Sequence, residues 1–124
     1  MRYLLDSNII IRVTMGSGDA LRARIAECDA GDLVTSAIAL AEVVYGSAQG
    51  KPPALNQLRA FLEEVPVLDF DLEAALAYAS LPFRRASYDR LIAAHAMSQK
   101  LTVVTDNVAH FADLTGLAVE NWTI

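Results

Sequence analysis

Short apolar runs alternate with longer helical patterns along the whole chain, and this alternation strongly restricts the fold. Runs typical of β-strands lie at residues 2–5, 33–35, 65–68, 101–105 and 117–120. Apolar residues at helical spacing predict helices over 9–15, 20–30, 54–64, 72–81 and 89–100, with another beginning after Ser36. Strands that alternate with helices usually form parallel sheets. We therefore predict one α/β domain over residues 1–124, with a mostly parallel central sheet and helices on both faces.

Length and composition limit the classes that this domain can belong to. A chain of 124 residues is long enough for one core and too short for two domains. Its longest stretch without a charge, Ala74 to Phe83, is too short to span a bilayer. The N-terminus lacks the pattern of a secretory signal, so we expect a cytoplasmic protein without a membrane partner. Cys28 is the only cysteine, which excludes a disulfide framework and a cysteine metal site.

Asp6 is the only charged residue between Tyr3 and Ile11. A carboxylate in such an apolar run is costly to bury unless a cation, a metal or hydrogen-bond donors meet it. If residues 2–5 form a central strand, Asp6 lies at its carboxyl end, where open α/β sheets bind their ligands. The alternative is that Asp6 or Ser7 only caps the helix that follows.

Glu42 is a second isolated carboxylate. It is the only charge between Leu33 and Gly50, and its helical neighbours Ile38 and Tyr45 direct it toward the interior side of its helix. A structural alternative is a buried ion pair with an arginine from elsewhere in the chain. We favour a functional role, because Glu42 follows a strand as Asp6 does.

Two further positions repeat this arrangement. Asp89 opens the helix predicted over 89–100, although an acid in a first helical turn is also common for reasons of the helix dipole. Asp106 and Asn107 directly follow LTVVT, the most strand-like run of the chain. In a parallel sheet these points converge on one edge.

Carboxylates gathered at one edge predict a site for a hard divalent cation. Two of them about 4 Å apart repel by roughly 4 kcal/mol at an effective dielectric constant near 20, so several would not all stay ionised unaided. Mg²⁺ or Mn²⁺ accepts such oxygen ligands, whereas the single cysteine and the absence of a histidine pair argue against zinc. Acidic metal sites typically serve phosphodiester hydrolysis. The net charge of -5 argues against a simple electrostatic grip on nucleic acid, but bound cations would offset it locally.

Four ordered motifs extend over nearly the whole chain: LLDSN at 4–8, TSAIALAEVVYG at 35–46, DRLIAAHA at 89–96 and VVTDNVAHF at 103–111. Together they resemble the PIN-domain family, and within it the VapC-type ribonuclease toxins of bacterial toxin-antitoxin pairs. The resemblance implies a PIN-like three-layer α/β/α fold and a homodimer. It also implies Mg²⁺- or Mn²⁺-dependent endoribonuclease activity as the toxin of a type II system. The implied partners are an RNA substrate and a VapB-type antitoxin, through which DNA would be contacted only indirectly.

The resemblance also assigns roles to individual residues. Asp6, Glu42 and Asp89 match the three family acids, and Asn107 stands at the fourth catalytic position, which is acidic in other members. Asp6 and Asp89 are the expected metal ligands. Supporting roles fall to the polar residues beside these positions: Asn8, Ser36 and Asp106.

Arg84 and Arg85 replace the family's glycine-containing loop ahead of Asp89. We hypothesise that they contact RNA phosphate. A PIN fold that only docks a partner, and regulates DNA through it, remains the alternative, whereas a phosphate-accepting receiver domain would need an acid pair after the first strand.

Overall fold

A five-stranded, all-parallel sheet forms the centre of the computed structural model, which describes residues 1–16, 18–85 and 87–124. The strands are β1 (Tyr3–Leu5), β2 (Leu33–Ser36), β3 (Val67–Leu68), β4 (Thr102–Val104) and β5 (Val119–Glu120). Their order across the sheet is β3-β2-β1-β4-β5, so β1 is central. Its residue Leu4 pairs with Val34 on one side and Val103 on the other. The predicted mostly parallel sheet is confirmed.

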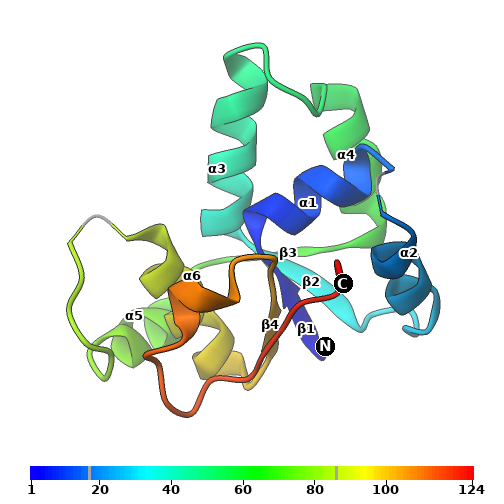
Figure 1. Cartoon of the computed structure of the whole chain (residues 1–124). Helices are drawn as coiled ribbons and strands as arrows, with labels where there is room; N and C mark the ends of the chain where they lie inside the picture. Colours follow the sequence, from blue (N-terminus) through cyan, green and yellow to red (C-terminus); the bar gives the residue numbers. More distant parts are fainter. Residues whose placement is uncertain (17, 86) are drawn as a thin grey trace.

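Helices cover both faces of this sheet. They are α1 (Ser7–Thr14), α2 (Asp19–Ala26), α3 (Ala37–Ala48), α4 (Leu55–Glu64), α5 (Leu72–Tyr78), α6 (Tyr88–Gln99) and the short 3-10 helix η1 (Val108–Phe111). Figure 1 shows α1, α2 and α4 on one side of the strands and α5 and α6 on the other. The predicted three-layer α/β/α architecture is therefore confirmed. None of the helices in the described part of the chain is both long and apolar enough to cross a membrane.

The central strands are continuous apolar runs because both of their faces are buried in the core. Leu4 and Leu5 of β1 are completely buried, as is Val103 of β4, because helices cover the sheet on both sides. Ile9 of α1 and Ile92 of α6 are also fully buried in the same core. The central strand therefore ends in a rigid apolar environment, and this fixes the position of whatever follows it.

Polar residues at the strand ends begin the next helices. The Asp6 carboxylate accepts a hydrogen bond from the backbone N–H of Ser7 and caps α1, and the Ser36 hydroxyl accepts one from the N–H of Ile38 and caps α3. In the same way the Ser87 hydroxyl caps α6. The caps of α1 and α3 lie at the carboxyl edge of the sheet.

The second helix is shorter than predicted. The pattern over 20–30 predicts a helix that ends near Gly31, whereas α2 ends at Ala26. The Asp32 carboxylate accepts a hydrogen bond from the backbone N–H of Asp29, which stabilises a turn in place of another helical turn.

Candidate active site

Asp6 lies almost fully buried at the end of β1, with only 3% of its surface exposed. Its Oδ1 accepts a hydrogen bond of 2.8 Å from the Ser7 N–H, and its Oδ2 accepts one of 2.9 Å from the Thr105 hydroxyl. Burial raises the pKa of Asp6, and the negative charges of Asp89 and Asp106 add to this effect, while the two hydrogen bonds lower it. Asp6 is thus a helix cap, as in the structural alternative, and also a buried carboxylate close to other acids.

Glu42 projects from α3 toward the same group of acids. Its Oε1 is buried and accepts no hydrogen bond from the residues that the structure describes. Burial raises its pKa to about 7, with further upward contributions from the charges of Asp6 and Asp89, while a side-chain hydrogen bond with Ser7 lowers it. Because the charges that act on Glu42 are both negative, the alternative of neutralisation by an arginine has no support here. Glu42 is the carboxylate with the least compensation.

Asp89 lies in the first turn of α6 and is half-buried. Its Oδ2 lies 3.0 Å from Nδ1 of His110, which belongs to η1. Both residues line a cleft of about 340 Å³, together with Glu42, Arg84, Arg85, Ser87 and Tyr88. Two carboxylates and two arginines therefore share one hollow, which can hold a cation and an anion side by side.

The two residues after β4 differ in their surroundings. Oδ2 of Asp106 forms an ion pair of 3.0 Å with Nε of Arg12 on α1. Asn107 is exposed, and its backbone N–H donates to the Thr105 hydroxyl. Its side-chain amide makes no hydrogen bond with the described residues. This arrangement leaves Asn107 more available than Asp106 to a ligand.

Ser36 and Asn8 lie apart from the cleft. The Ser36 hydroxyl is fully buried, where it caps α3 and lies 2.8 Å from Nδ1 of His95. It can therefore affect Glu42 only by fixing the start of α3. Oδ1 of Asn8 is buried and has no hydrogen-bond partner within the described ranges.

Two residues of the site were missed by the sequence reasoning. Thr105 is fully buried beside Asp6, because β1 and β4 pair in parallel. A polar residue at the end of the LTVVT run could have been noticed as a possible partner. His110 reaches Asp89 across 21 positions of sequence through the placement of η1, and no sequence pattern signals that contact.

The carboxylates of the site could bind a hard cation if only one or two of them contact the ion directly. Over residues 1–16, 18–85 and 87–124, no three His, Cys, Asp or Glu side chains are gathered closely enough to hold one ion between them. Mg²⁺ commonly binds through one or two carboxylates and keeps several waters. Asp6 and Asp89 can supply these two ligands, and the buried, unpartnered Oε1 of Glu42 suits a contact through water.

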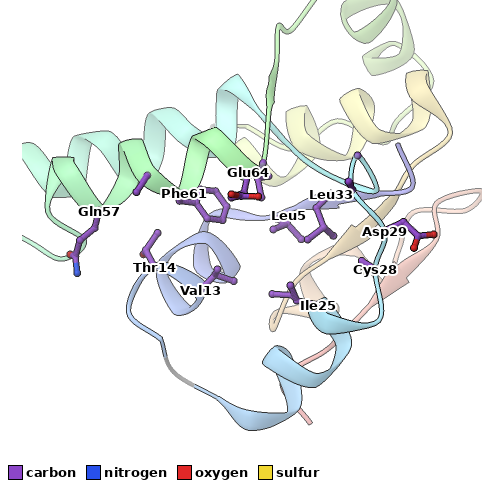
Figure 2. Close-up of a pocket in the computed structure, with 14 residues that line it drawn as sticks. Leu5, Val13, Thr14, Ile25, Cys28, Asp29, Leu33, Gln57, Phe61 and Glu64 are labelled. Atoms are coloured by element: carbon purple, nitrogen blue, oxygen red, sulfur yellow. The ribbon is translucent and has the colours of Figure 1, made fainter.

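A larger hollow, of about 660 Å³, lies away from these acids. Figure 2 shows that its walls come from α1, α2 and α4 and from the strands below them. Val13, Ile25, Leu33 and Phe61 give it a mainly apolar lining. Because the apolar residues predominate, this hollow suits an apolar segment better than a reaction, although Asp29, Gln57 and Glu64 also belong to its lining.

The PIN domain family model matches residues 3–117, a span that contains all of the acids described above. The chain belongs to the PIN-domain family. Similar proteins include the tRNA(fMet)-specific endonuclease VapC of Salmonella typhimurium, 29% identical with 98% of each chain covered. Ribonuclease VapC2 of Rickettsia felis is 30% identical, again over 98% of each chain.

Solved structures of related complexes have the same fold as this PIN domain. VapBC2 from Rickettsia felis bound to a DNA fragment from their promoter has a TM-score of 0.82 and 28% identity, covering 98% of this chain and 99% of the other. VapBC-1 from nontypeable Haemophilus influenzae has a TM-score of 0.80 and 31% identity, with both chains fully covered. The family assignment made from the four motifs is confirmed.

Proposed function

We propose that this PIN domain is a Mg²⁺- or Mn²⁺-dependent endoribonuclease that acts as the toxin of a type II toxin-antitoxin pair. The observation that carries the proposal is Glu42, a half-buried carboxylate whose buried Oε1 has no hydrogen-bond partner in the described residues and whose pKa is raised further by the charges of Asp6 and Asp89. A fold keeps such a destabilising group where function requires it. Relatives of similar length that are named VapC ribonucleases support the reaction class.

Each residue has a role that follows from its surroundings. Asp6 and Asp89 would hold the ion, which supplies Lewis-acid stabilisation of the phosphate and lowers the pKa of a bound water. Glu42 accepts a proton at Oε1 from the attacking water, because a pKa of about 7 suits a general base near neutral pH. Arg84 and Arg85 line the same cleft and bind phosphate oxygens of the RNA.

The Asp6→Asn variant tests this proposal. Asparagine keeps an oxygen that can cap α1, so the fold should persist while the charge that holds the ion is lost. We expect purified wild-type protein to yield RNA fragments with Mg²⁺ and none with EDTA, and Asp6→Asn to yield none in either buffer. Asp19→Asn is the control, since Asp19 is exposed on α2 and its one ion pair in the described part of the chain is with Arg22.

Full cleavage by Asp6→Asn, or cleavage that EDTA leaves unchanged, would refute the proposal. An absence of Mg²⁺-dependent fragments from the wild type would instead favour a non-catalytic PIN module that only docks a partner. The asparagine at position 107, where other family members carry an acid, is the feature that favours this alternative.

A VapB-type antitoxin is the partner that we propose for the apolar hollow between α1, α2 and α4. Related VapC chains are found in VapBC complexes, and a hollow lined by Val13, Ile25 and Phe61 suits an apolar segment of such a protein. Contact with DNA would come through the antitoxin, because the chain has a net charge of -5. Homodimer formation and a cytoplasmic location also remain predictions.

A further inference from the structure

Tyr88 stands between two neighbouring hollows. One is the charged cleft with Glu42 and Asp89. The other, of about 440 Å³, is lined by Tyr78, Ser87, Tyr88 and Leu91. Because Ser87 and Tyr88 line both, the second hollow opens directly beside the acids.

Among the described residues, the lining of the second hollow is mainly aromatic and apolar, and none of it is charged. Tyr88 is 58% exposed, and Tyr78 on α5 is half-buried. Leu91 lies three residues after Tyr88 and therefore on the same face of α6. Neither tyrosine hydroxyl makes a hydrogen bond within the described ranges, so both are available to a ligand. This is a lining for a flat ligand with apolar faces and polar edges.

We propose that this hollow is a base subsite, which binds one nucleobase of single-stranded RNA next to the phosphate held in the charged cleft. The inference rests on the proposed ribonuclease function and deepens it. Stacking of unpaired bases on aromatic side chains is the usual way in which proteins read single-stranded RNA. The volume lies within the range of roughly 300–1,000 Å³ found for small-ligand sites.

Cations beside the subsite favour RNA over a protein segment as the occupant. Arg84 and Arg85 line the adjoining cleft, and Phe83, which is 81% exposed, directly precedes them. Guanidinium groups bind phosphates bidentately and stack on bases, whereas an apolar protein segment would gain little from two arginines. One nucleotide could place its phosphate beside the arginines of the cleft and stack its base on the Tyr88 ring in the adjoining hollow.

Abasic RNA tests the subsite separately from catalysis. A short single-stranded RNA and a series with one abasic nucleotide at each position in turn are titrated against the full-length Asp6→Asn chain by fluorescence anisotropy. We expect an abasic site at one position to weaken binding by roughly ten- to a hundredfold, the effect of one lost base stack. In a Tyr88→Ala background that difference should disappear, and Tyr88→Phe, which keeps the ring, should restore most of it.

Tyr45→Ala is the matched control, because Tyr45 is an exposed tyrosine on α3 that lines neither hollow. Equal binding of every abasic RNA would overturn the inference, and so would discrimination that survives Tyr88→Ala. A change in oligomeric state or antitoxin binding without loss of discrimination would identify a protein interface and also overturn it. Cleavage of intact RNA by the wild type is scored separately, so the proposed function can stand while the base subsite fails.

Discussion

Replacing Glu42 with glutamine should stabilise the folded chain while abolishing RNA cleavage. Burial and two nearby carboxylates raise the pKa of Glu42 from 4.5 to about 7. At roughly 1.4 kcal/mol per pKa unit, this shift corresponds to an upper limit of about 3 kcal/mol of destabilisation when Glu42 is ionised. Because Glu42 is only half-buried, solvent screening reduces the penalty, and we expect a gain of about 1–2 kcal/mol in Glu42→Gln.

The sign of the pH dependence follows from the direction of the shift. Below about pH 4.5, Glu42 is protonated in both the folded and the unfolded chain and costs nothing. Between about pH 4.5 and 7 the unfolded chain releases the proton and the folded chain retains it, so the folded state loses stability as pH rises. Glutamine carries no charge at any pH. The stabilisation by Glu42→Gln should therefore be near zero at about pH 4 and complete above about pH 7.

Urea unfolding in EDTA buffer, repeated from about pH 4 to about pH 8, measures this difference. Glu63→Gln is the control, since Glu63 is exposed on α4 and makes no ion pair or side-chain hydrogen bond with the described residues. An equal effect of Glu42→Gln at both ends of the pH range, or no gain at about pH 8, would refute the reasoning. Added Mg²⁺ should then stabilise the wild type more than the variant, because the ion offsets the same repulsion.

Three further outcomes are expected. Replacing both Arg84 and Arg85 with alanine should weaken RNA binding and reduce the salt slope of log K by roughly 1.4, as measured by titration at several salt concentrations. Thr105→Val should lower the free energy of unfolding by about 1–3 kcal/mol, because Oδ2 of the buried Asp6 loses its donor. Ala60→Arg, which places a charge in the apolar hollow, should weaken antitoxin binding by about tenfold or more in calorimetry while RNA cleavage persists.

The fold class could be predicted from the sequence because the central strands carry their own signal. Runs such as 2–5 and 101–105 are apolar on both sides of the strand, as burial beneath two helical layers requires. The edge strands were less well predicted. Only Val67–Leu68 of the run 65–68 forms a strand, since its extent depends on where Thr35 and Ser36 of β2 offer partners. Such pairing is a property of the folded sheet.

Asp6 and Glu42 could be selected as candidates from the sequence because local rules do not favour an acid at either position. Asp6 interrupts an apolar run, and Glu42 lies on the side of its helix that faces the protein interior. The local sequence gives no structural reason for a charge at either position. His110 and Thr105 were missed for the opposite reason. Both are ordinary in their local context, and only the folded arrangement brings them to Asp89 and Asp6.

The three acids differ in how far hydrogen bonds and ion pairs offset their negative charges. This difference determines which of them destabilises the fold most. Asp6 receives hydrogen bonds at both oxygens, and Asp89 has His110 within 3.0 Å. Glu42 has only the side-chain hydrogen bond with Ser7 to offset the charges of the other two, and its buried Oε1 has no partner among the described residues. The site thus combines one carboxylate that directly follows β1 and is hydrogen-bonded at both oxygens with one less compensated carboxylate on α3. For that reason Glu42→Gln should stabilise the fold more than Asp6→Asn, even though both remove one negative charge and both abolish cleavage.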